Sequence, residues 1–131
     1  MIEFHLDSRS GVPAYLQLVQ QVRQAIRLGM LRPGDQLPTV KEVVASLTIN
    51  PNTVLHAYRQ LDLEGLVEGR RGVGTFVASA TAPPPPDDLK ILRSSLDRWL
   101  GRAREAGLDD ESIQALFAAA TRAATEDSRV A

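Results

Sequence analysis

Hydrophobic and polar residues follow two different periods in the first 30 residues of the chain. Residues 2–6 (IEFHL) alternate one by one, the pattern of a half-buried strand that could join a small sheet. After Pro13 the apolar residues recur every three or four positions, which predicts a helix that Pro13 opens at its first position and Gly29 ends. The apolar face of this helix consists of Tyr15, Leu18, Val19, Val22 and Ile26.

Capping residues predict two further helices. Thr39 and Glu42 have the spacing of a capping box, and the helix that they open carries apolar residues as far as Leu47. Asn50 is a good N-cap, and Pro51 suits the next position because the N–H that proline lacks would have no partner there. We expect this helix over residues 50–64, ended by Gly65. Its apolar stripe consists of Val54, Ala57, Tyr58, Leu61 and either Leu63 or Leu66.

A glycine-rich loop with two arginines follows these helices. Residues 66–68 and 75–78 are short β-prone runs on either side of GRRGVG at 69–74, which predicts a hairpin. Two short helices with a tight turn, followed by a hairpin, form a winged helix-turn-helix. Four consecutive prolines then break the pattern, and we predict a semi-rigid linker at residues 81–87 between a domain at 1–80 and a tail at 88–131.

The tail is predicted to form two amphipathic helices. Gly107 ends the first of them, and Asp109 caps the second. A helix pair of this length buries too little surface to be stable alone, so it needs either its own winged helix or a second copy of the chain as a partner. Because the proline linker holds the tail away from the first domain, we expect a homodimer. The fold class is therefore mostly α: three helices with a small antiparallel sheet, then a two-helix dimerisation tail. The residues predicted to form the dimer interface are Leu89, Leu92, Leu96, Trp99, Ile113, Leu116 and Phe117.

Composition excludes several classes of function. The chain has no cysteine, and its two histidines, His5 and His56, are far apart, so we predict no metal site. Neither a Gly-x-Gly-x-x-Gly nor a Walker pattern occurs, and no serine has a nucleophile-elbow setting, so we expect neither an enzyme nor a cofactor. The sequence contains no apolar run of the roughly 18–20 residues that cross a bilayer, and we expect a cytoplasmic protein without a membrane partner.

The net charge of −1 is unusual for a nucleic-acid-binding protein, but local charge matters more for phosphate contacts. The start of the helix at 50–64 is polar, as required of a recognition helix in the major groove, and the basic wing at 69–74 suits phosphates or the minor groove. The candidate residues for binding double-stranded DNA are Lys41, Asn50, Asn52, Thr53, His56, Arg70, Arg71 and Gly72. These residues could instead be capping or solvated groups.

Two other functions remain open at this point. A winged helix can serve as a protein-interaction adaptor, which the acidic net charge favours. Alternatively, a small-molecule effector could bind in the tail around Trp99, although an aromatic residue on such a seam is more often part of an interface.

The order and spacing of four segments resemble a known family. PGDQLP, NPNTV, AYRQLDLEGLV and GVGTFV, within residues 4–77, resemble the winged-helix DNA-binding domain of the GntR family of bacterial transcription regulators. The INPNTV segment and the two-helix tail are similar to the YtrA subfamily. The resemblance implies a DNA-binding regulator, expected to be a repressor, that dimerises through its tail on a palindromic operator and often controls neighbouring transporter genes.

The resemblance also implies particular DNA contacts. It places them at Lys41, Asn52, Thr53, Arg71 and Gly72. Pro51 and Leu55 occupy positions that are often arginine or polar in such regulators, so base reading is expected to depend more on Asn52, Thr53 and His56.

Overall fold

A computed structural model describes the backbone of residues 2–78 and 86–130, with side chains to residue 127. Its contacts divide the chain into two compact units, Met1–Pro85 and Pro86–Ala131, and each unit is considered by itself. The predicted linker at residues 81–87 lies outside the described residues except for its last two positions.

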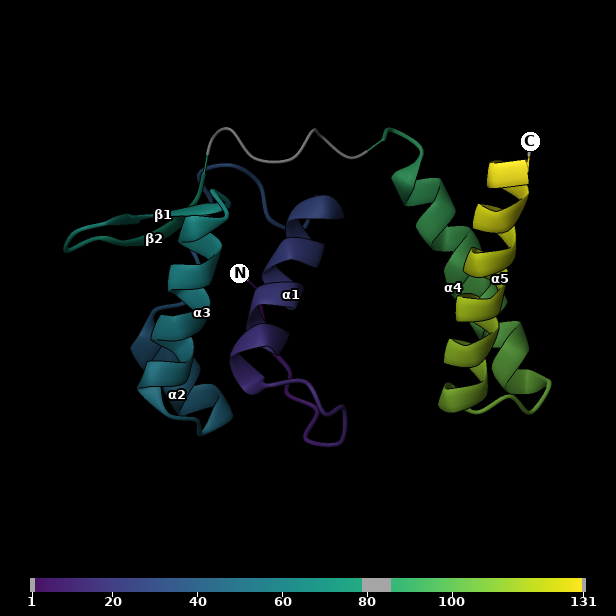
Figure 1. The fold of residues 1–131 in the computed structure, drawn as a ribbon, viewed down its shortest axis with the longest axis horizontal. Coiled ribbons are helices and arrows are strands. Elements are labelled where there is room, and N and C mark those ends of the chain that lie inside the picture. The colour runs from purple at the N-terminus through teal and green to yellow at the C-terminus, as the bar shows by residue number, and fades with distance from the viewer. Residues whose placement is uncertain (1, 79–85, 131) are drawn as a thin grey trace. The chain divides into compact units, whose positions relative to one another are not determined.

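The first unit contains three helices and a hairpin. The helices are α1 (Ala14–Arg27), α2 (Val40–Leu47) and α3 (Pro51–Leu63), and the strands are β1 (Val67–Arg70) and β2 (Gly74–Val77). Helix α3 is central, since both α1 and α2 pack against it. The two strands pair antiparallel, and Figure 1 shows them extending to one side from the C-terminal end of α3. This order of elements confirms the predicted mostly α fold with a small antiparallel sheet.

Apolar residues from α1, α3 and the hairpin form one core. Leu18, Val19 and Val22 of α1 belong to the same buried cluster as Val54, Ala57, Tyr58 and Leu61 of α3. Burial of each such side chain contributes about 1.5–3 kcal/mol relative to exposure. Of the two alternatives for the last residue of the stripe, Leu66 packs partly buried against the core from beyond the end of α3, whereas Leu63 is 84% exposed.

Both caps predicted for the helix-turn-helix are present. The Thr39 hydroxyl accepts the Glu42 backbone N–H at 3.1 Å, and the Glu42 carboxylate accepts the Thr39 N–H at 3.2 Å. The Asn50 side-chain oxygen accepts the Asn52 N–H at 2.8 Å, and Pro51 occupies the first helical position. The prediction for Pro13 was wrong by one residue, because this proline lies at the N-cap position of α1, without a side-chain hydrogen bond, and the helix begins at Ala14.

The turn between α2 and α3 requires an unusual backbone conformation. Thr48 has a φ of 54°, and among the described residues it alone combines a positive φ with a side chain. The left-handed region costs a non-glycine residue about 1–2 kcal/mol. Beyond this turn, the buried Tyr58 hydroxyl of α3 donates a hydrogen bond to the backbone carbonyl of Pro38. This bond fixes α3 to the segment that precedes α2. Burial, and secondarily the charge of Glu42, raises the pKa of Tyr58 well above its usual range, so the phenol remains a donor.

The expectation of a strand at residues 2–6 was wrong. Phe4 is buried, as the alternation predicted, but the segment pairs with side chains of α1: the His5 N–H donates to Gln21 Oε1 at 2.9 Å, and Gln21 Nε2 donates to the His5 carbonyl at 2.6 Å. The loop before α2 lies beside the hairpin instead, with a single bridge between Gln36 and Phe76. Within residues 2–78 the sheet therefore has two strands.

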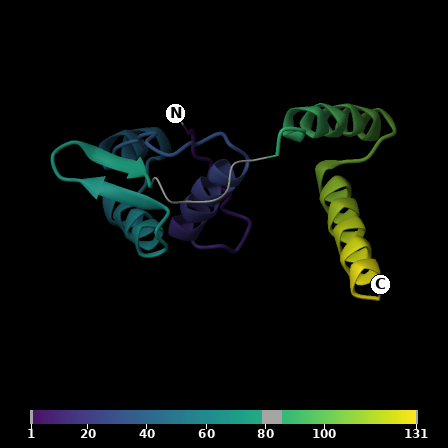
Figure 2. The same ribbon diagram turned by 90° about the horizontal axis from the view of Figure 1, so that it is seen from above.

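The second unit consists of α4 (Leu89–Glu105) and α5 (Asp110–Val130). Gly107, with a φ of +96°, lies in the turn between them, and the Asp109 carboxylate caps α5 by accepting the Ser112 N–H at 2.8 Å. Hydrogen bonds from the side chain and the backbone N–H of Ser112 lower the pKa of Asp109 below its usual range. Figure 2 shows the two helices diverging from this turn. No described helix is long and apolar enough to span a bilayer.

Candidate nucleic-acid interface

One face of α3 is polar and exposed. Because Val54 and the other buried residues of α3 face the core, the helical repeat places Asn52, His56 and Arg59 in a row on the opposite side. Arg59 forms no ion pair or side-chain hydrogen bond with any residue that the structure describes. The sequence pattern leaves either Arg59 or Gln60 on the polar side of this helix, and Arg59 is the more exposed of the two.

Other candidates flank the start of α3 in different environments. Thr53 is half-buried, while Lys41 is exposed in the first turn of α2. The α2 N-terminus carries a partial positive charge, so Lys41 lies where a phosphate would be favoured. The Asn50 oxygen is used by the cap, which leaves its amide N–H groups as the part of this side chain that can contact DNA.

The beginnings of α1 and α3 meet around an aromatic stack. The rings of Tyr15 and His56 lie 3.9 Å apart between centroids, with an interplanar angle of 14°. An open hollow of about 390 Å³ adjoins the stack. It is lined by Pro13, Ala14, Tyr15, Asn50, Asn52, Thr53 and His56, and thus brings together the predicted DNA-binding residues of α3 and of its N-cap.

The two wing arginines differ in their surroundings. The Arg70 guanidinium carbon lies 4.3 Å from the Phe76 ring centroid, and its nitrogen lies 3.5 Å from the Glu68 carboxylate. Arg71 is exposed at the tip and has no side-chain partner among the described residues. Gly72, with a φ of +77°, provides the left-handed conformation that the tip requires. Arg71 is therefore the wing cation that is free to contact a phosphate.

Gln36 contacts the wing at its turn, next to the tip. Its side-chain amide donates to the Val73 carbonyl at 3.3 Å. A Cβ on Gly74 would lie 2.5 Å from the same amide nitrogen, so the glycine permits this close approach. The position of the tip thus depends on a loop that precedes α2.

Most of the predicted dimerisation residues are accessible within the tail. The exposed fractions are 58% for Leu92, 39% for Leu96, 36% for Trp99 and 45% for Leu116. Leu89 and Phe117 are half-buried, and Ile113, at 3%, is enclosed by the helix pair itself. Ile91, which we did not predict, adds another apolar side chain that is 65% exposed.

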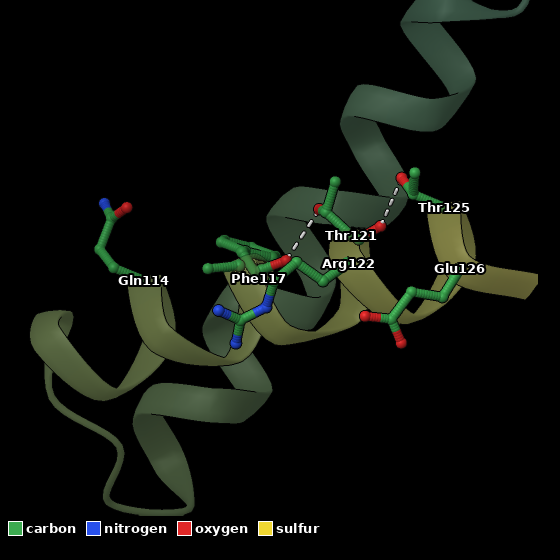
Figure 3. A pocket seen from close by; sticks show the side chains of 7 residues that line it. Gln114, Phe117, Thr121, Arg122, Thr125 and Glu126 are labelled. Atoms are coloured by element: carbon green, nitrogen blue, oxygen red, sulfur yellow. Dashed lines mark hydrogen bonds between the residues drawn. The ribbon is translucent and has the colours of Figure 1, made fainter.

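A hollow of about 570 Å³ lies on one face of α5, shown in Figure 3. Its lining residues are Gln114, Phe117, Ala118, Thr121, Arg122, Thr125 and Glu126. The Thr121 and Thr125 hydroxyls donate to carbonyls one turn earlier in the same helix, at 2.8 and 3.0 Å. Trp99 is not part of this hollow and instead contacts Phe117, with 5.1 Å between ring centroids. Nowhere in the described part of the chain do three or more histidine or carboxylate side chains lie together as potential metal ligands.

The chain is similar to several bacterial regulators. The family profile described as "Bacterial regulatory proteins, gntR family" matches residues 14–77. The chain is 34% identical over 109 residues to the HTH-type transcriptional repressor YtrA of Bacillus subtilis (strain 168), with 82% of this chain and 84% of that protein covered. It is 36% identical over 103 residues to the HTH-type transcriptional regulator Rv1152 of Mycobacterium tuberculosis, covering 79% of this chain and 81% of that protein.

Solved structures of other regulators share the fold. YtrA from Sulfolobus acidocaldarius, a GntR-family transcription factor, matches with a TM-score of 0.56 and 31% identity over 75% of this chain and 97% of that one. AraR(DBD) in complex with operator ORX1 matches with a TM-score of 0.52 and 26% identity over 59% of this chain and 96% of that one. The YtrA similarity extends over most of both chains, and the chain therefore belongs to the GntR family of bacterial transcription regulators, within its YtrA subfamily.

Proposed function

We propose that this protein is a sequence-specific DNA-binding repressor that acts as a homodimer on a palindromic operator. The observation that carries the proposal is the exposed polar row of α3, in which Asn52, His56 and Arg59 have no hydrogen-bond or ion-pair partner for their side chains among the described residues. In the helix-turn-helix docking mode such a row enters the major groove. The operator complex of the similar AraR(DBD) supports DNA as the partner.

The proposed DNA contacts are of two chemical kinds, contacts to bases and contacts to phosphates. Asn52 suits bidentate pairing with adenine, and Thr53 can contact a thymine methyl group or a phosphate. Lys41 and Arg71 supply positive charge for phosphates, which fixes the register without reading sequence. The corresponding assignment is DNA binding to residues 1–80, a spacer to 81–87 and dimerisation to 88–131.

Association through the tail follows from the apolar surface that α4 and α5 leave uncovered. Ala103 and Ile113 are buried between the helices, while Leu92, Leu96 and Trp99 remain exposed. An apolar surface of this kind is stabilised by a second copy of the same surface, and two copies related by a twofold axis present two recognition helices to a palindrome.

Selection from random DNA with the purified protein tests the function. We expect an inverted repeat whose half-sites are separated by about one helical turn, or a multiple of it. Asn52→Ala should relax one base preference and cost about 1–3 kcal/mol on the best site. Failure of the wild-type protein to enrich any sequence would contradict DNA reading, and would favour the adaptor function.

Sedimentation tests the dimer separately. Leu92→Asp with Leu96→Asp should shift the protein towards monomer, because it places two charges on the apolar surface of α4. Leu63→Asp is the matched control, since Leu63 is 84% exposed in the first unit and should leave association unchanged. A tail variant that sediments as the wild type does would exclude this surface as the interface.

A further inference from the structure

The stacked pair of Tyr15 and His56 connects α1 to the DNA-reading row of α3. At 3.9 Å and 14°, the rings are close to parallel and in face-to-face contact. The two residues come from different helices, so the stack is a tertiary contact and not a consequence of the α3 repeat. The stack holds the His56 ring, which belongs to the exposed polar row of α3, in a defined orientation.

Stacking leaves the hydrogen-bonding edge of His56 available. The contact uses the ring face, whereas the two ring nitrogens lie in the ring plane. Neither nitrogen has a hydrogen-bond partner within residues 2–78 and 86–127, and His56 is exposed. Asn52 lies one turn earlier on the same face of α3. The ring therefore combines a fixed plane with an unused polar edge beside a residue suited to base reading.

We propose that His56 reads a base in the major groove and that Tyr15, without reading a base itself, is the positioning residue that fixes the plane of the His56 ring. This inference rests on the proposed function, since it assumes that α3 enters DNA. Purines present acceptors at N7, and guanine adds O6, so a ring N–H of His56 would favour a purine at its position. A preoriented side chain loses less rotational freedom on binding than one that moves freely in solvent.

The expected loss of DNA affinity follows from the rotational freedom that the His56 side chain would regain without the stack. Ordering an exposed side chain at an interface weakens binding about two- to tenfold. Tyr15→Leu keeps an apolar side chain against the core but removes the stack, so it should weaken binding to the best site by about that factor. Tyr15→Phe keeps the aromatic face and should preserve both affinity and base preference. A purely structural role for Tyr15 would change stability without changing which base is preferred.

The test compares motifs selected from random DNA by the full-length wild type, Tyr15→Phe, Tyr15→Leu, His56→Ala and the double variant Tyr15→Leu/His56→Ala. Circular dichroism first verifies that each variant is folded, and Tyr15→Met replaces Tyr15→Leu if the latter is not. We expect Tyr15→Leu and His56→Ala to lose preference at the same base position. In the His56→Ala background, Tyr15→Leu should cause no further loss.

Each outcome decides the inference. An unchanged motif for Tyr15→Leu, with an altered motif for His56→Ala, would overturn the positioning role. Unchanged motifs for both would overturn base reading by His56 while leaving the proposed function intact. If the wild type selects no motif, the proposed function fails, and the inference fails with it.

Discussion

Arg71→Ala is the substitution whose effect on DNA binding can be worked out most directly. Arg71 stands exposed at the wing tip without a side-chain partner among the described residues. Its removal should therefore eliminate a phosphate contact while breaking no interaction within the hairpin. We expect weaker binding to all DNA sequences, with no change in base preference.

The size of the effect depends on salt. Each phosphate that a protein neutralises contributes about 0.9 to the slope of log Kobs against log salt concentration. A dimer carries two wings, so Arg71→Ala should reduce the slope by about 1.8. Over a fourfold rise in salt, the affinity ratio of wild type to variant should then shrink by about twelvefold.

Fluorescence anisotropy with labelled operator, measured at several salt concentrations, provides the assay. Arg70→Ala is the matched control, because its guanidinium packs on Phe76 and pairs with Glu68. This control should change the slope much less than Arg71→Ala. Equal slopes for wild type and Arg71→Ala, or a larger change for Arg70→Ala, would refute the assignment of the free cation at the tip.

Three further predictions concern the fold that holds α3. Tyr58→Phe leaves the buried Pro38 carbonyl without its donor, so it should lower the free energy of unfolding by about 1–3 kcal/mol; an unchanged Tm by circular dichroism would contradict this. Thr48→Gly should raise stability by about 0.5–1 kcal/mol in urea unfolding, since relief of the left-handed conformation exceeds the backbone entropy cost of glycine; a loss of stability would argue against strain. Glu64, whose pKa is lowered mainly by its hydrogen bond from Arg23, stabilises the fold when ionised. Glu64→Gln should therefore cost about 0.2–1 kcal/mol near neutral pH, and the difference should vanish as the wild-type carboxylate becomes protonated below about pH 4; a difference that persists in acid would show that the charge is not its cause.

The helix boundaries around the helix-turn-helix could be predicted because local groups fix them. Thr39 and Glu42 satisfy each other across three residues, and Asn50 satisfies the N–H of Asn52 two residues later. Such bonds depend on sequence spacing alone. The same reasoning correctly identified Pro51 as the start of a helix and not as a break within one.

Contacts between distant elements could not be predicted in this way. Alternation at residues 2–6 indicated correctly that Phe4 is buried, but it does not specify which element satisfies the backbone, and the Gln21 side chain does so. Likewise, nothing in the sequence pairs Tyr15 with His56, because their contact depends on how α1 crosses α3.

At the wing, too, the sequence alone could not predict which side chains contact one another. Arg70 and Arg71 are adjacent and equivalent as basic residues, and only the hairpin geometry separates them. Strand pairing places Glu68 opposite Phe76, and Arg70 contacts both side chains from the same strand as Glu68. Arg71 lies beyond the last paired position of β1 and is left free.

In the proposed mode of binding, a dimer reads a palindrome with two copies of α3. The most direct measurement compares the affinity of the full-length protein for the selected inverted repeat with its affinity for a single half-site of equal length in the same salt. Two linked contacts should make the inverted repeat bind about 100-fold tighter or more. Equal affinity for the repeat and the single half-site would contradict the claim.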